Sequence, residues 1–212
     1  MTTHGIIFDL DGTLIDSAPS ILASIEAAFE SIGIRPAQEL TQALIGPPLV
    51  ETLNSVLRAQ DANYLPDLIE LFKHHYDETG YLNTRVYAGV PQMLEALSCL
   101  GVCLWIATNK RIVPTRHIVN HLGWQNVFQG VYALDFWTPS LANKAAMLLR
   151  LQNELQITER RVTYVGDRAE DAEAARSCGM PFVWAAWGYG PEKQAMGETN
   201  LITKPRDLFM FT

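Results

Sequence analysis

Short apolar runs recur along the chain, separated by stretches in which apolar residues repeat at helical spacing. The runs occupy residues 5–8, 102–107, 131–134, 162–165 and 182–185. Apolar residues on both faces of a short run are typical of parallel strands that are covered by helices. We therefore predict five buried strands.

Helical patterns fill the intervals between the later runs. Apolar side chains repeat at helical spacing in residues 91–100, 111–122, 143–155 and 171–178. Three of these patterns are followed by Gly101, Gly123 or Gly179, and glycine in this place is typical of a helix end. Strands that alternate with helices predict an α/β fold with an open, doubly wound parallel sheet.

One interval, residues 16–85, breaks this alternation. It has strong helical character and no convincing strand, whereas a plain crossover between parallel strands needs only ~30 residues in all. Its first helical pattern, residues 20–30, is amphipathic. We expect residues 16–85 to form an inserted α-helical cap domain, and residues 1–15 and 86–212 to form the α/β core.

Composition and charge limit the classes of function. The 212 residues are 48% hydrophobic and 18% charged, with a formal net charge of −7. These values fit a globular protein and disfavour a nucleic-acid surface, which needs a basic stripe. We find neither a signal-peptide pattern nor the ~20 consecutive apolar residues that span a bilayer. The three cysteines show no metal spacing, so we expect reduced thiols in a cytoplasmic protein, a monomer or homodimer with no nucleic-acid or membrane partner.

The first strand ends in two carboxylates separated by one residue. Alternate residues of a strand project to the same face, so Asp9 and Asp11 could address one ligand. Like charges this close are costly unless a cation or a shared proton offsets them. The segment Asp-Leu-Asp-Gly-Thr at residues 9–13 fits an active site, but an Asp-Gly turn that closes an ordinary strand explains it equally well.

Polar residues also follow two later strands, and the carboxyl ends of parallel strands share one edge of a sheet. These residues, with one lysine that begins a helix, are Thr108, Asn109, Lys110, Lys144, Asp167 and Asp171. Taken singly, each fits a solvated loop, a surface lysine or a helix cap. Together they predict a site for Mg²⁺, which binds through a few carboxylates, waters and substrate phosphate.

This set of side chains suits phosphoryl transfer. Asp9 is suited to attack phosphorus, since aspartate can form an aspartyl-phosphate. Asp11 is placed to protonate the leaving oxygen and afterwards to activate water. Thr108 and the Lys144 ammonium, with backbone N–H groups, could neutralise charge on the transferring phosphoryl oxygens.

These motifs resemble those of the haloacid dehalogenase superfamily, in its phosphoglycolate phosphatase-like branch with a helical cap. Residues 9–13 match the nucleophile motif, residues 108–110 the second motif, Lys144 the third and residues 166–171 the acidic fourth. The third motif departs from the family, because Ala145 stands where proline is usual. The similarity covers nearly the whole chain.

The resemblance implies a Rossmann-like core and Mg²⁺-dependent hydrolysis of a small phosphorylated metabolite through an aspartyl-phosphate. It implies that Asp9, the backbone carbonyl of Asp11 and Asp167 hold Mg²⁺, with Asp171 as a supporting or water-mediated ligand. The phosphate- or substrate-binding residues are then Thr108, Asn109, Lys110 and Lys144.

Other functions stay open beside this one. They are a phosphomutase of the β-phosphoglucomutase type, a nucleotidase or pyrophosphatase, and a non-catalytic binding module. A dehalogenase is disfavoured, because it has no use for the second acid at Asp11.

Substrate choice is expected to lie in the cap. Residues 46–49, Gly-Pro-Pro-Leu, occupy the place of the family's specificity loop. Lys110 and Arg168 lie nearest the inferred chemistry and are expected to contact substrate, and the expected hinges are residues 16–17 and 84–85. The remaining basic residues of the interval are more simply read as solvated side chains: Arg35, Arg58, Lys73, His74, His75 and Arg85.

Overall fold

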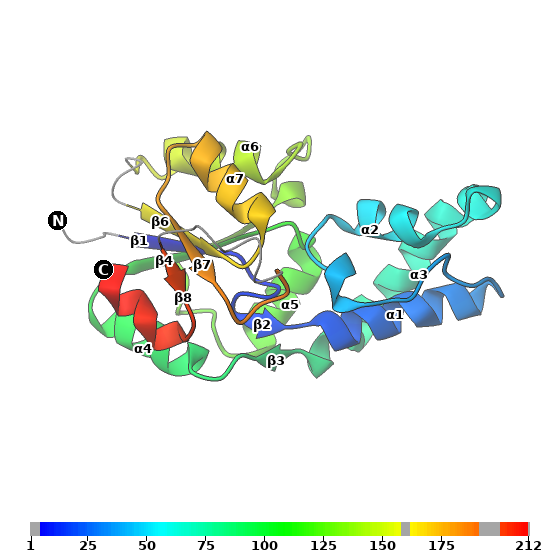
Figure 1. Ribbon diagram of the computed structural model, residues 1–212, viewed down its shortest axis with the longest axis horizontal. Helices are drawn as coiled ribbons and strands as arrows, with labels where there is room; N and C mark the ends of the chain where they lie inside the picture. The colour runs from blue at the N-terminus through cyan, green and yellow to red at the C-terminus, as the bar shows by residue number, and fades with distance from the viewer. Residues whose placement is uncertain (1–4, 158–161, 191–199, 212) are drawn as a thin grey trace.

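A parallel six-stranded sheet with helices on both faces forms the larger part of the molecule (Figure 1). The computed structural model describes residues 5–157, 162–190 and 200–211. The strand order is β5-β4-β1-β6-β7-β8, and every neighbouring pair runs parallel. The predicted α/β fold with a doubly wound parallel sheet is confirmed.

All five predicted strands are present, with ends within one residue of those expected. The strands of the sheet are β1 (Gly5–Phe8), β4 (Cys103–Thr108), β5 (Gly130–Ala133), β6 (Val162–Gly166), β7 (Phe182–Ala185) and β8 (Leu201–Ile202). The sequence patterns missed β8, which has only two residues, one of them exposed. Strand β1 lies between β4 and β6 and is buried over its whole length.

Two apolar layers hold the helices against the sheet. Along β1, Ile6 and Phe8 face one layer and Ile7 faces the other, as the alternation of side chains in a strand requires. The first layer contains α4 (Val90–Cys99) and α5 (Ile112–His121), and the second contains α6 (Lys144–Glu154) and α7 (Ala169–Ser177). Two 3₁₀ helices, η4 (Leu134–Phe136) and η6 (Pro205–Phe211), also belong to this part of the molecule.

Between β2 (Ile15–Asp16) and β3 (Arg85–Val86) the chain is helical. These two strands pair antiparallel, Ile15 with Val86 and Asp16 with Arg85, and they were not expected from the sequence because two residues show no periodicity. The helices of this stretch are α1 (Ala18–Ser31), η1 (Gln42–Leu44), α2 (Leu49–Val56), η2 (Ala59–Tyr64), α3 (Leu65–Glu78) and η3 (Gly80–Asn83). We call residues 17–84 the helical segment.

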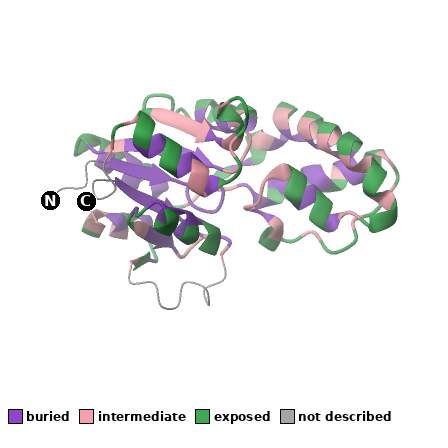
Figure 2. Ribbon diagram, turned by 90° about the horizontal axis from the view of Figure 1, so that it is seen from above, coloured by how far each residue is buried: buried purple, intermediate pink, exposed green. Residues whose placement is uncertain are grey.

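The helical segment has an apolar cluster of its own, to which α1, α2 and α3 contribute Ile25, Leu53 and Phe72. It extends from the end of the molecule to which the carboxyl ends of the central strands point (Figure 1). Buried positions line the inward faces of its helices, and exposed ones lie outside (Figure 2). Within the described residues, no helix is both long and apolar enough to cross a bilayer.

Candidate functional site

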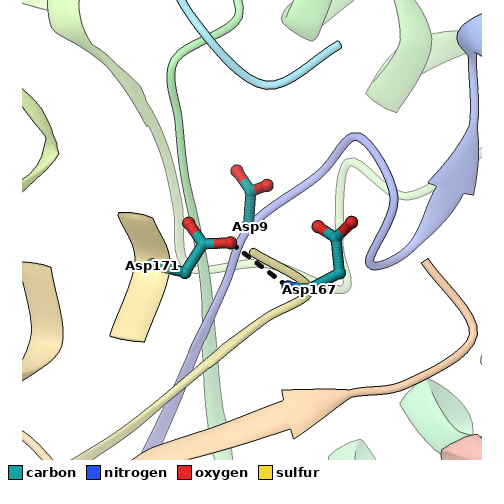
Figure 3. A group of neighbouring side chains, drawn as sticks. All are labelled: Asp9, Asp167 and Asp171. Carbon is teal, nitrogen blue, oxygen red and sulfur yellow. Dashed lines mark hydrogen bonds between the residues drawn. The ribbon is translucent and has the colours of Figure 1, made fainter. Parts of the chain in front are cut away.

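Three buried carboxylates meet at the carboxyl ends of the central strands. Asp9 follows β1, Asp167 follows β6, and Asp171 lies in the first turn of α7 (Figure 3). Each offers an oxygen atom within 4.8 Å of the other two. Because β1 and β6 are neighbours in the sheet, their ends bring residues far apart in the sequence together.

Burial makes the charged forms of these acids costly. It raises the pKa of Asp9 to about 7; the Lys144 ammonium opposes this rise, and the carboxylates of Asp171 and Asp167 add to it. Burial likewise raises the pKa of Asp167 to about 7, with Asp171 adding to the rise. A bound cation would remove much of this cost, since an opposite charge favours the ionised form.

The donor set fits a hard divalent cation. Asp9 Oδ1 is buried and makes no hydrogen bond within the described residues, although the Lys144 ammonium lies 3.0 Å from it in an ion pair. Asp167 accepts hydrogen bonds from Thr13 Oγ1 at 3.3 Å and from the backbone N–H of Tyr189 at 2.7 Å. Carboxylate oxygens of this kind are the ligands that Mg²⁺ prefers.

Asp171 already has partners for both of its carboxylate oxygens. Oδ1 accepts from Lys144 Nζ at 2.5 Å and from the Tyr164 hydroxyl at 3.4 Å. Oδ2 accepts from the backbone N–H groups of Asp167 and Arg168 at 3.1 and 3.0 Å. These contacts cap the start of α7 and fix the lysine, so Asp171 is better placed to support the site than to bind a cation directly.

Lys144 lies between two of the acids. It is the first residue of α6, where the Asn143 side chain caps the helix by accepting from the Ala146 N–H at 2.9 Å. Burial lowers the pKa of Lys144, but the carboxylates of Asp171 and Asp9 together raise it by more. The pKa of Lys144 therefore lies well above its ordinary value. The lysine is therefore a fixed, protonated cation beside Asp9.

The Asp11 side chain has a different environment from the three acids. Lys110 Nζ lies 3.1 and 3.2 Å from its two oxygens, and the Ser17 hydroxyl donates to Oδ1. The described group of three carboxylates does not include it. Asp9 and Asp11 thus project from one short loop into two different electrostatic surroundings.

The remaining predicted residues lie at the same edge of the sheet. Thr108 ends β4 and is buried, and its hydroxyl accepts from the Lys110 backbone N–H at 3.2 Å. Asn109 donates from Nδ2 to the Gly46 carbonyl at 3.0 Å. Asn109 therefore joins the loop after β4 to the predicted specificity loop.

Arg168, which was expected to contact substrate, instead binds the backbone of the helical segment. Its guanidinium donates to the carbonyl of Ile45 and, at 3.1 Å, to that of Ala43. Gly46 packs so closely here that a β-carbon would lie 2.6 Å from Arg168 Cδ. The loop after the predicted metal ligand Asp167 is thus fastened to residues 43–46.

Sequence patterns missed residues whose contacts depend on tertiary packing. The Tyr189 hydroxyl accepts from the backbone N–H groups of Ser17 and Ala18 at 2.7 and 2.9 Å and donates to Asp16 at 2.9 Å. Tyr189 thereby links Asp167 to the start of α1. The only sequence signal is its place in a Gly-Tyr-Gly loop after β7.

A small cavity beside Asp11 separates the core from the helical segment. Lys110 and Asn109 line it, whereas the six basic residues expected to be solvated do not. Those six are Arg35, Arg58, Lys73, His74, His75 and Arg85.

Comparison with known proteins agrees with this geometry. Residues 6–185 match the model of the haloacid dehalogenase-like hydrolase family. The chain is 33% identical over 191 residues to the phosphoglycolate phosphatase of Xylella fastidiosa, covering 87% of this chain and 80% of that protein. A haloacid dehalogenase-like hydrolase of Streptococcus pneumoniae has the same fold, with a TM-score of 0.85, 22% identity, and coverage of 98% of this chain and 97% of that one.

A further relative is longer than this chain. The tyrosine-protein kinase PtkA of Mycobacterium tuberculosis is 33% identical over 186 residues, which are 87% of this chain. The matched region spans 62% of the length of PtkA.

The raised pKa values predict how pH affects the metal-free protein. Asp9 and Asp167 have folded-state pKa values of about 7, above the unfolded value of 3.8. The folded state therefore holds protons that the unfolded state releases, and stability falls as pH rises from about 4 to about 7. We expect Mg²⁺ to raise the melting temperature more at about pH 8 than at about pH 5.5.

Differential scanning calorimetry with EDTA or excess Mg²⁺ at the two pH values measures this difference. Asp167→Asn should reduce both the pH dependence and the Mg²⁺ shift, whereas the exposed control Asp67→Asn should leave both intact. An equal Mg²⁺ shift at the two pH values in the wild-type protein would contradict the assignment.

Proposed function

The chain belongs to the haloacid dehalogenase-like hydrolase family, as its motifs predict, and from the chemistry of its site we propose that it hydrolyses a small phosphomonoester, as a phosphoglycolate phosphatase-like enzyme, through an aspartyl-phosphate on Asp9. The observation that carries this proposal is the buried Asp9 carboxylate. Its Oδ1 forms an ion pair with the fixed Lys144 ammonium at 3.0 Å, makes no hydrogen bond among the described residues, and lies near two further acids. An oxygen in this state is suited to attack phosphorus.

Two half-reactions follow from the placement of Asp9 and Asp11. In the first, an Asp9 oxygen forms a bond to phosphorus while the bond to the leaving oxygen breaks, and protonated Asp11 gives its proton to that oxygen. In the second, Asp11 takes a proton from water as the water oxygen attacks phosphorus and releases Asp9. Phosphate and an alcohol are the products.

Positive charge supports both steps. Asp9, Asp167 and the backbone carbonyl of Asp11 would hold Mg²⁺, which when bound neutralises charge on the carboxylates and on the phosphoryl oxygens. Lys144, positioned by Asp171, and the Thr108 hydroxyl bind the remaining phosphoryl oxygens. Stabilisation of charge is most of what phosphoryl transfer requires.

We further propose that residues 16–85 act as a cap over this site, with hinges at residues 16–17 and 84–85. The β2–β3 pair supports this, because it joins the two ends of the helical segment. Arg168 and Asn109 of the core both donate to backbone carbonyls of residues 43–46. A cap held in this way excludes water from the phosphoryl group.

Asp9→Asn should abolish phosphate release, because an amide neither attacks phosphorus nor supports the metal. The expected loss in kcat is on the order of 10³-fold or more. Malachite-green detection of phosphate with 2-phosphoglycolate and Mg²⁺ measures it, circular dichroism checks the fold, and Asp67→Asn on the surface of α3 is the matched control. Undiminished turnover in Asp9→Asn would rule out the nucleophile. Product analysis tests the phosphomutase alternative, which isomerises a sugar phosphate without releasing phosphate.

Asp171→Asn should lower kcat by about 10- to 100-fold, the usual cost of losing a group that orients a catalytic residue. The amide keeps the size of the side chain but loses the charge that pairs with Lys144 at 2.5 Å. Glu173→Gln on the exposed side of α7 is the matched control. If Asp171→Asn changed Mg²⁺ affinity alone and left kcat intact, Asp171 would be a metal ligand and not a support for Lys144.

Arg168→Ala should loosen residues 43–46, since it removes both guanidinium contacts to that loop. Hydrogen–deuterium exchange should speed up by about 10-fold in peptides covering these residues. Arg176→Ala, which removes a surface ion pair with Glu173, is the matched control and should leave the loop unchanged. Equal exchange in the two variants would show that Arg168 does not hold the cap.

A further inference from the structure

Two consecutive residues of the core contact two consecutive residues of the helical segment. The core residues are Lys110 and Arg111, which follow β4, and the others are Tyr76 and Asp77 of α3. The Lys110 ammonium lies 4.6 Å from the centre of the Tyr76 ring. Arg111 Nη2 lies 2.5 Å from Asp77 Oδ1 in an ion pair. We call these four residues the α3 contact, because they fasten α3 to the loop after β4.

The lysine of the α3 contact also binds the proposed proton-transfer group. Lys110 Nζ donates to both oxygens of Asp11, at 3.1 and 3.2 Å. The two side chains are only 6% and 10% exposed. Because water screens a buried ion pair much less than an exposed one, this contact strongly favours one position of the Asp11 carboxylate.

One oxygen of Asp11 depends on Lys110 alone. Oδ1 also accepts from the Ser17 hydroxyl, whereas within the described parts of the chain Oδ2 has no hydrogen-bond partner besides Lys110. Lys110 therefore sets the direction of Oδ2. This is also the Asp11 oxygen with fewer protein partners, so it is the better placed of the two to exchange a proton with a substrate.

The ring beside Lys110 has a fixed position of its own. Tyr76 is 1% exposed, and its ring stacks on that of Phe72, one turn earlier in α3, with the ring centres 5.3 Å apart. A cation over an aromatic face is attracted to it. Since lysine has a flexible four-carbon stem, a fixed ring beside the ammonium restricts where that ammonium can lie.

We propose that Lys110 is a positioning residue that aims Asp11 at the leaving oxygen, and that α3 holds Lys110 in place through the α3 contact. The proposal rests on the proposed phosphatase function, in which a proton passes from Asp11 to the leaving oxygen as its bond to phosphorus breaks. Lys110 then acts through Asp11 and not by touching the substrate. The helical segment thereby influences the proton transfer from a helix that carries none of the proposed catalytic residues.

Two substrates of similar size isolate the proton transfer. Ethyl phosphate releases an alkoxide unless a proton reaches the leaving oxygen, whereas acetyl phosphate releases acetate, which is stable without that proton. Measured as kcat/KM, the comparison covers the steps up to release of the leaving group and excludes the later attack of water.

Lys110→Met keeps the length of the side chain and removes its charge. We expect kcat/KM for ethyl phosphate to fall about 10- to 100-fold, as for other groups that orient a catalytic residue. The fall for acetyl phosphate should be at least several-fold smaller. Lys73→Met, which removes a surface ion pair with Glu70, is the matched control and should change neither value.

Asp77→Asn tests the part played by α3. It weakens the ion pair with Arg111, and Asp77 itself makes no contact with Asp11 within the described residues. We expect a loss that is again larger for ethyl phosphate than for acetyl phosphate, but smaller than in Lys110→Met. Glu78→Gln, the next residue of α3, removes an exposed ion pair with His74 and should have no such effect.

The ratio of the two losses separates positioning from other roles. Equal losses for both substrates in Lys110→Met would overturn the proposal, because Lys110 would then serve stability or phosphate binding. Asp77→Asn keeps the buried pair between Lys110 and Asp11, so it tests the proposal even if Lys110→Met does not fold. Unchanged kcat/KM for ethyl phosphate in Asp77→Asn would overturn the role of α3.

Stability measurements distinguish failure of this proposal from failure of the phosphatase proposal. Scanning calorimetry of Lys110→Met, Asp11→Asn and the double variant needs no turnover. If Lys110 holds Asp11, the double variant should melt at a higher temperature than the sum of the two single shifts predicts. Additive shifts would overturn the proposal. If the shifts are not additive but the wild-type protein releases phosphate from neither substrate, the contact stands and only the hydrolytic proposal fails.

Discussion

The repulsion among three buried carboxylates is the constraint on which the site depends. Asp9, Asp167 and Asp171 are almost fully buried, and their oxygens lie within 4.8 Å of one another. One ammonium, that of Lys144, lies among them within ion-pair distance of Asp9 and Asp171. Three negative charges against one leave an excess that only protons or a cation can offset. Burial, together with the repulsion from neighbouring carboxylates, raises the pKa of both Asp9 and Asp167 to about 7.

The fold makes the cluster possible by allowing the backbone to approach the acids closely. Gly12 has a φ of +86°, and a β-carbon there would collide with the Asp167 carboxylate. At Gly188 a β-carbon would likewise lie only 2.3 Å from Asp167 Cβ. Backbone N–H groups of Tyr189 and Gly190 donate to the same carboxylate. Glycine thus lets loops from two different strands enclose one acid.

The sequence predicted the core and its acids because both depend on local patterns. A buried strand followed by an acid is visible within a few residues, and the order of strands in a doubly wound sheet brings such ends together. The strands β2, β3 and β8 were missed because two residues carry no periodicity. The contacts of Tyr76, Arg168 and Tyr189 were missed for a different reason. Each depends on how the helical segment packs on the core, and no spacing along the chain reports that.

Most of the buried polar atoms that lack a hydrogen bond belong to residues of the carboxylate cluster or the cavity. Among the described residues, five buried side-chain atoms lack a hydrogen bond. Two of them belong to Thr84, which directly precedes β3, and to His117 of α5. The other three belong to Asp9, Asn109 and Tyr76, the last two of which line the cavity beside Asp11.

A fold selected for stability alone would remove such atoms, since each costs free energy when it is buried. Three of the five instead lie at the carboxylate cluster or in the lining of the cavity, where a bound ligand can supply the missing hydrogen bonds. Asp9 Oδ1, which has an ion pair with Lys144 at 3.0 Å but no hydrogen bond among the described residues, would then bind the metal or attack phosphorus. The acids at the sheet edge would thus act on the phosphoryl group, and the cavity that the helical segment borders would receive the rest of the substrate.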